Sequence, residues 1–234
     1  MPKVHFLYEL YTDIKQCTLA WEWILVVDGA ERTPIPKKLK NDGRIVECRV
    51  GRQVGTAASR NMGLGISRGE FVTACDDDDR LPARSFEVRL DALRSAHVDW
   101  VAGLLADLRG QEQIVWNCPA PRGYIRAGEL WKSWISPEAT YPLGPSTLLM
   151  RTALLRQVGG WQGLPQAEDL GMVMAVSGVA AGVVLDEVVY LYRRHDGQMM
   201  NQPDFDSIEP LVREITFERG RLLCELLAPR GQSN

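Results

Sequence analysis

Residues Glu70 to Pro82 read Glu-Phe-Val-Thr-Ala-Cys-Asp-Asp-Asp-Asp-Arg-Leu-Pro, and this stretch decides the fold that we expect. Phe71 to Cys75 form an apolar run typical of a buried strand, and the run stops at four consecutive aspartates. The Leu-Pro that follows opens a helical pattern with proline near its first turn. The sequence therefore predicts a strand, an acidic loop and a helix, in that order.

The four aspartates repel one another, and a bound cation would offset that repulsion. Hard divalent cations such as Mg²⁺ and Mn²⁺ take oxygen ligands, and residues alternate sides in an extended chain, so Asp76 and Asp78 can face the same way. The carboxyl end of a strand is also where open α/β sheets bind ligands. The alternative is a solvated acidic turn that caps the next helix. Both interpretations stay open on this stretch alone.

Composition narrows the class of protein. The 234 residues suit one domain, and 45% hydrophobic with 24% charged residues is normal for a globular protein rather than a disordered one. A net charge of -3 without a dense Lys/Arg run argues against a nucleic-acid groove. We find neither an apolar stretch of membrane-spanning length nor a signal-peptide core, so we expect a cytoplasmic protein; peripheral membrane association stays open.

The five cysteines are widely spaced and odd in number, and no CxxC pair indicates zinc. We expect reduced thiols, and we interpret Cys75 as strand packing despite its place beside the aspartates.

Strand-like and helical patterns alternate through residue 106. Trp21 to Val27 is an apolar run followed by Asp28-Gly29, which we interpret as a central strand that leads into a ligand loop. Arg44 to Val50 is a second strand, Gly55 to Gly69 contains a helix, and Val98 to Ala106 is a further strand with which Ile114 to Trp116 pairs. This alternation predicts an α/β fold with a Rossmann-like, mostly parallel central sheet flanked by helices.

The chain changes character after residue 106. Residues 119–145 are rich in Pro, Gly and aromatic side chains, and Trp131 and Trp134 stand at helical spacing. These two tryptophans fit a half-buried core position, with stacking on a sugar ring as the alternative.

The last third of the chain adds a second acidic motif. Glu168-Asp169 begins a helix through about Ser177, with its carboxylates near the positive end of the helix dipole. Two strands are expected at 182–185 and 188–193, and a long helix at about 204–228 carries apolar residues at helical spacing.

Six short motifs in this order resemble the family 2 glycosyltransferases with the GT-A fold, over roughly residues 7 to 200. Each motif alone is weak, and their shared order makes the resemblance specific. The motifs are Trp23-Ile-Leu-Val-Val-Asp-Gly29, Gly55-Thr-Ala-Ala-Ser-Arg-Asn-Met-Gly63, Gly69-Glu-Phe-Val-Thr-Ala-Cys-Asp-Asp-Asp-Asp79, Val158-Gly-Gly-Trp161, Glu168-Asp169 and Tyr192-Arg-Arg-His-Asp-Gly197.

The resemblance implies roles for individual residues. Asp76 and Asp78 match the outer aspartates of the Asp-x-Asp motif, which hold Mn²⁺ or Mg²⁺ on the donor diphosphate. Asp169 matches the general base of inverting members, and His195 is either a further metal ligand or an ordinary loop histidine. Asn61 has two possible roles, one in helix packing and one at the nucleotide. The remaining candidates for nucleotide-sugar binding are Asp28, Arg60, Asn61, Asp77, Glu168, Arg193 and Arg194, together with Asp76.

One departure from the family concerns the start of the chain. Family members begin with an apolar strand, whereas this chain starts almost directly in the helix that follows it, so we expect the first strand to be missing or truncated. The second aspartate usual after Asp28 is Gly29. A partner subunit or another segment is the alternative source of that sheet edge.

The resulting prediction is a single domain. Residues 1–106 would bind the nucleotide sugar, residues 107–200 the acceptor, and the helix at 204–228 would pack on the body or on a second subunit in a homodimer. The predicted function is a metal-dependent, inverting transfer of sugar from a nucleotide diphosphate sugar, with UDP favoured, to a hydroxyl of a glycan, lipid-linked or small-molecule acceptor. A non-catalytic nucleotide- or sugar-binding scaffold with a degraded donor site is the alternative.

Overall fold

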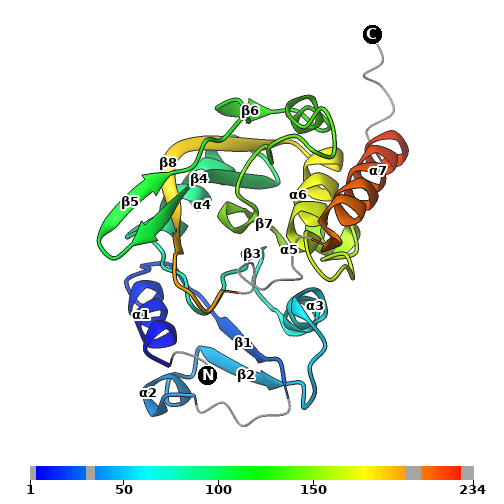
Figure 1. The fold of residues 1–234 in the computed structure, drawn as a ribbon. Coiled ribbons are helices and arrows are strands. Elements are labelled where there is room, and N and C mark those ends of the chain that lie inside the picture. The colour runs from blue at the N-terminus through cyan, green and yellow to red at the C-terminus, as the bar shows by residue number, and fades with distance from the viewer. Residues whose placement is uncertain (1–3, 30–34, 199–206, 228–234) are drawn as a thin grey trace.

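The computed structural model describes residues 4–29, 35–198 and 207–227, and its elements form two sheets with helices around them (Figure 1). The helices are α1 (Val4–Ile14), α2 (Lys37–Lys40), α3 (Thr56–Ile66), α4 (Ser85–Ser95), α5 (Thr152–Gln157), α6 (Glu168–Val179) and α7 (Glu209–Leu227), with 3-10 turns η1 (Leu130–Ser133) and η2 (Pro145–Thr147). The strands are β1 (Trp23–Val27), β2 (Ile45–Arg49), β3 (Phe71–Val72), β4 (Trp100–Arg109), β5 (Glu112–Val115), β6 (Gly123–Ile125), β7 (Leu149–Arg151) and β8 (Gly182–Arg193).

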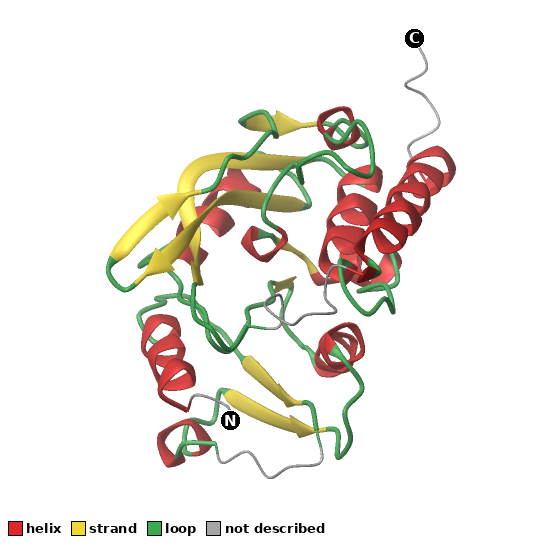
Figure 2. Ribbon diagram, in the orientation of Figure 1, coloured by secondary structure: helices red, strands yellow, loops and turns green. Residues whose placement is uncertain are grey.

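The longest ladders, β1–β2 and β4–β8, are parallel, and shorter antiparallel ladders complete the larger sheet. The larger sheet has the order β3-β7-β4-β8-β6, and β5 pairs with β4 as predicted from Ile114 to Trp116. Along the chain, strands and helices alternate through the first half, and this element order confirms the α/β class (Figure 2).

The strand β1 is not central within the described part of the chain. It pairs only with β2, and no described strand lies ahead of α1. The prediction of a central strand at Trp21 to Val27 is thus wrong for the described residues, because β1 has a single neighbour among them.

The two strands predicted at 182–185 and 188–193 form the single strand β8. The ladder with β4 shifts register between Ala102 and Leu104, which leaves the polar pair Asp186 and Glu187 exposed while the strand continues. The sequence pattern suggested a break because these two charged residues interrupt an apolar run.

The main core lies between the larger sheet and helices α5 and α6. Strand β4 is buried along nearly its whole length, and α6 is buried on almost all sides because α7 packs against it (Figure 1). Trp134 is fully buried and Trp131 packs against the same core, so the core interpretation of these tryptophans is confirmed. The start of α6 is thereby held rigidly beside the loop that follows β3.

Helix α1 belongs to the body of the domain. Leu7, Leu10, Tyr11 and Ile14 are buried at the spacing of one helical face. No described helix is long and apolar enough to span a membrane.

Candidate active site

The aspartate run lies in a short loop between β3 and α4. Its last member, Asp79, is fully buried, whereas Asp77 is exposed. The hydroxyl of Tyr190 on β8 donates to Asp79 Oδ2 at 2.7 Å and accepts the backbone N–H of Asp76 at 3.2 Å. The loop is therefore fixed to β8 through one phenol group.

Burial raises the pKa of Asp79 to about 8, and the negative charge of Asp76 adds to the shift. A carboxyl group with this pKa is mostly protonated at neutral pH, so it can remain buried next to other aspartates. The backbone N–H of Arg193 also donates to Asp79 Oδ1 at 2.8 Å. The fourth aspartate thus supports the loop.

The predicted metal ligands Asp78 and His195 lie together. The distance from His195 Nε2 to Asp78 Oδ2 is 2.8 Å. The backbone N–H of Gly197 donates to His195 Nδ1 at 3.1 Å, so Nε2 carries the proton of the neutral ring and faces the carboxylate. Asp78 is thereby connected to the loop after β8.

The other predicted ligand, Asp76, pairs with Arg60 instead. Arg60 donates from one nitrogen to Asp76 Oδ1 and from another to Glu168 Oε1, both at 2.8 Å. Its side chain is only 15% exposed. One buried guanidinium on α3 therefore joins the acidic loop to the start of α6.

The carboxylates of Glu168, which is buried, and Asp169, which is half-buried, form an acidic pair at the start of α6. Burial raises the pKa of Glu168 to about 7, and the charge of Asp169 contributes. Burial also raises the pKa of Asp169, while Arg60 opposes that shift. The preceding residue, Ala167, has a φ of 54°, a left-handed conformation that is uncommon for alanine. This turn directs both carboxylates into the site.

We expect Arg60→Gln to destabilise the fold strongly at neutral pH. Removing the cation leaves Asp76, Glu168 and Asp169 without compensation, and breaking a buried ion pair in this way costs about 3–5 kcal/mol. Below pH 6 Glu168 binds a proton in the folded state, so the loss should shrink. Urea unfolding at pH 7.5 and pH 5 measures both values.

The matched control for that experiment is Arg68→Gln. Arg68 pairs with Glu22, but its side chain is 77% exposed, so the loss should be at most about 1 kcal/mol at either pH. An equal loss for the two variants, or no dependence on pH for Arg60→Gln, would contradict the role assigned to Arg60.

Two other predicted residues bind backbone in this structure. Asp28 accepts the N–H groups of Val54 and Gly55 at 2.7 and 2.8 Å, and so holds the segment that begins α3. The side chain of Asn61 exchanges hydrogen bonds with the backbone of Trp161 at 2.8 and 2.9 Å. The structure therefore favours the packing role for Asn61, which joins α3 to the turn before α6.

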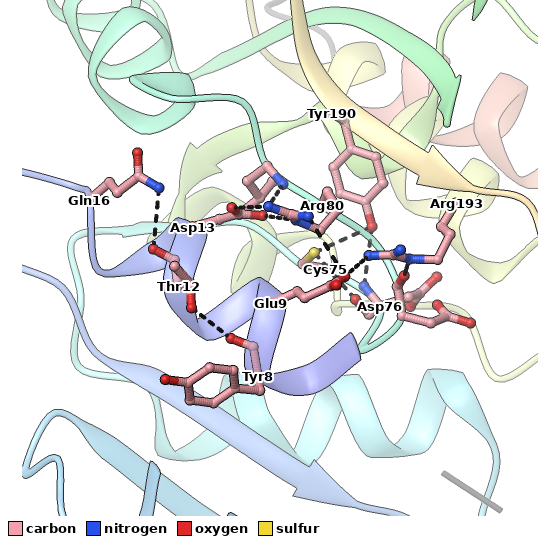
Figure 3. Close-up of polar contacts among 12 residues, drawn as sticks. Tyr8, Glu9, Thr12, Asp13, Gln16, Cys75, Asp76, Arg80, Tyr190 and Arg193 are labelled. Atoms are coloured by element: carbon pink, nitrogen blue, oxygen red, sulfur yellow. Dashed lines mark hydrogen bonds and ion pairs between the residues drawn. The ribbon is translucent and has the colours of Figure 1, made fainter. Parts of the chain in front are cut away.

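The two arginines after β8 differ in their contacts. Arg193 donates to the Asp78 carbonyl at 2.6 Å and to Glu9 of α1 (Figure 3). Arg194 pairs with Asp107 at 2.8 Å and stacks over Trp116. Arg193 therefore touches the acidic loop.

Helix α1 is attached to the same loop through a second ion pair. Arg80 donates to both oxygens of Asp13 at 2.5 and 2.7 Å, and the N–H of Leu81 donates to Asp13 at 3.2 Å (Figure 3). The Asp13 side chain is 5% exposed. Asp13 and Glu9 thus secure α1 beneath the acidic loop.

We expect Asp13→Ala to lower the free energy of unfolding by about 2–3 kcal/mol, because Arg80 and the Leu81 N–H lose a buried, charged acceptor. Chemical denaturation measures the loss. Glu9→Ala is the control: Glu9 is 40% exposed, so its removal should cost less. A larger loss for Glu9→Ala would show that the attachment of α1 depends on Arg193 instead.

The donor set partly matches the metal prediction. No group of three or more His, Cys, Asp or Glu side chains able to hold a metal forms among the described residues. Asp78 and His195 do lie together, and a cation bound between them would take the place of the proton on His195 Nε2. Mg²⁺ typically uses one or two carboxylates and completes its shell with water and substrate phosphates. The residues present fit a cation that binds together with a diphosphate.

Sequence reasoning did not find four residues that shape this site, namely Asp79, Tyr190, Glu9 and Asp13. The acidic residues of α1 stand four apart, which places them on one face of the helix. Nothing in the sequence identifies Arg80 and Arg193 as their partners. Tyr190 lies in an apolar strand and carries no local signal.

The glycosyl transferase family 2 model matches residues 5–154, which include the acidic loop, Arg60 and most of the larger sheet. The chain belongs to this family. The family predicted from the six motifs is thereby confirmed. No curated protein matches the chain significantly.

Solved structures of S. aureus TarS resemble this domain. The structure of TarS 1–349 in complex with UDP-GlcNAc has a TM-score of 0.68 and 20% identity, and the match covers 89% of this chain and 62% of that one. The UDP complex of TarS 1–349 has a TM-score of 0.66 and 22% identity, with 82% and 57% covered. The chain thus spans less than two thirds of these relatives, and the likeness establishes the α/β GT-A fold.

Proposed function

We propose that this domain transfers a sugar from a nucleotide diphosphate sugar to a hydroxyl acceptor, with inversion at the anomeric carbon. The observation that carries the proposal is the convergence at Arg60. The acidic loop and the start of α6 are far apart in the sequence, yet Arg60 binds both Asp76 and Glu168 at 2.8 Å. The acidic loop, proposed to bind the donor, and the start of α6, which holds the proposed base, therefore meet in one site.

The proposed donor is a UDP-sugar. TarS is a structural relative whose complexes contain UDP-GlcNAc and UDP, which supports a uridine donor here. Asp78 and His195 would hold Mn²⁺ or Mg²⁺, with Asp76 as a further candidate. When bound, the cation supplies charge neutralisation of the diphosphate leaving group.

Asp169 is the proposed general base. Glu168 accepts a hydrogen bond from Arg60, whereas Asp169 accepts one from the backbone N–H of Leu170 at 2.7 Å. Its raised pKa favours proton uptake near neutral pH. The acceptor oxygen attacks the anomeric carbon from the face opposite the diphosphate, its proton passes to Asp169, and the nucleoside diphosphate leaves with the electrons of the broken C–O bond.

The same features favour an enzyme over a non-catalytic scaffold. Keeping Asp79 and Glu168 buried and Asp169 half-buried, all three with raised pKa values, is costly, and such groups concentrate at functional sites. The roles of Asp28, Asp77, Arg193 and Arg194 at the nucleotide, and a homodimer through α7, stay predictions.

The direct test is UDP release from individual UDP-sugars with Mn²⁺ present. We expect release from at least one donor, at the same rate for Asp91→Asn, a control on the exposed side of α4. If the protein binds no UDP-sugar and releases UDP from none, the proposal is contradicted and the non-catalytic scaffold is favoured.

A further inference from the structure

A cavity of about 240 Å³ lies beside the candidate site, between the middle of β4, the segment after β5, the loop before η2 and helix α7. This volume is below that of typical drug-sized pockets, so it suits one small ring rather than a chain. Its polar and aromatic walls come from Trp116, Asn117, Thr140, Tyr141 and Arg213.

The cavity lies between the two parts of the proposed active site. On one side, the carboxylate of Asp169 is near enough to Tyr141 to influence its pKa, which burial raises, Arg213 lowers and Asp169 raises further. On the other side, Leu105, which lines the cavity, is the register partner of Tyr190, the residue that binds the Asp76 N–H. A ring in the cavity would therefore lie between the proposed base and the acidic loop.

The walls favour a neutral ligand. Arg213 donates to the carbonyls of Pro137 and Ala139 and to Glu209, and it stacks over the Tyr141 ring at 4.4 Å. Because these contacts compensate its charge, we expect Arg213 to line the cavity without binding an anionic ligand.

The aromatic side chains define the ligand further. Trp116 is 36% exposed, its indole N–H is bound to Asp107 at 2.7 Å, and Arg194 lies over its ring at 5.6 Å from the ring centre. The exposed part of the ring is therefore the surface that Trp116 can offer. Tyr141 also lines the cavity and offers the part of its ring that Arg213 and Trp134 leave uncovered. The C–H-rich face of a pyranose packs well on aromatic rings, and the amide of Asn117 and the hydroxyl of Thr140 can bind its hydroxyl groups.

We propose that this cavity is the acceptor subsite and that the acceptor presents a neutral pyranose ring, packed against Trp116 and Tyr141. The proposal rests on the glycosyl transfer proposed above and adds the chemical class of the acceptor. It gives Tyr141 and Trp116 a binding role that is separate from the donor site.

The test measures UDP release from the active UDP-sugar alone and with a panel of neutral methyl glycosides, including methyl glucosides, galactosides and N-acetylglucosaminides. The variants Tyr141→Leu and Trp116→Leu keep apolar bulk and remove the aromatic face. Tyr124→Leu is the control, because Tyr124 is 59% exposed on β6 and does not line the cavity. Melting temperature and UDP affinity are measured for each protein.

We expect at least one glycoside to stimulate UDP release, and each cavity variant to raise the KM for that glycoside about tenfold or more, equivalent to about 1.4 kcal/mol. UDP affinity and glycoside-free hydrolysis should be retained, and Tyr124→Leu should match the unaltered protein. No stimulation by any glycoside, or stimulation unchanged in both cavity variants, would overturn the acceptor subsite while hydrolysis still supports transfer chemistry. If the unaltered protein hydrolyses no UDP-sugar, the proposed function itself is refuted.

Discussion

Asp169→Asn should lower kcat by about 10²–10⁴-fold, the usual contribution of a general base. Asparagine keeps the shape of the side chain but cannot accept the proton of the acceptor hydroxyl. Donor affinity should persist, because Arg60 forms its hydrogen bonds with Asp76 and Glu168 rather than with Asp169. Steady-state transfer rates and UDP titration measure the two properties separately.

The pH dependence of the rate provides the control for this prediction. The base acts only when deprotonated, and burial raises the pKa of Asp169, so kcat should rise as pH increases through that raised pKa. Asp169→Asn should remove this rise. An unchanged rate, or loss of UDP binding in the variant, would assign Asp169 a structural role instead.

Asp78→Asn should abolish the turnover that depends on Mn²⁺ while leaving the fold intact. Asp78 is the carboxylate that lies 2.8 Å from His195, and an amide is a far weaker ligand for a hard cation. Chelation with EDTA should likewise stop the unaltered enzyme, and added Mn²⁺ should restore it.

Asp91→Asn is the matched control, since it removes one carboxylate from the exposed side of α4 and leaves the loop untouched. Melting temperatures verify that both variants fold. Turnover of Asp78→Asn at the normal rate, or turnover that persists in EDTA, would contradict metal dependence at this position.

The sequence predicted the order of elements well because its signals are local. The apolar run before the aspartates, the helical pattern of the last long helix and the pairing of Ile114 to Trp116 with the preceding strand all appear in the structure. Strand extents were less predictable. Phe71 to Cys75 gives only the two-residue strand β3, because the chain then turns toward Tyr190.

Partners in the site were less accessible to sequence reasoning. Arg60 was predicted at the nucleotide, yet its contacts with Asp76 and Glu168 depend on the tertiary fold, which brings this side chain of α3 within reach of both. The support given by Asp79 and Tyr190 depends on the course of β8 past the loop. Tertiary contacts of this kind leave no periodic trace in the chain.

Calorimetric titration of UDP with and without Mn²⁺ decides whether the acidic loop is a donor site. We expect binding that requires Mn²⁺ and is lost in Asp78→Asn. Absence of binding under both conditions, in a protein with a normal melting transition, would contradict a donor site at the acidic loop.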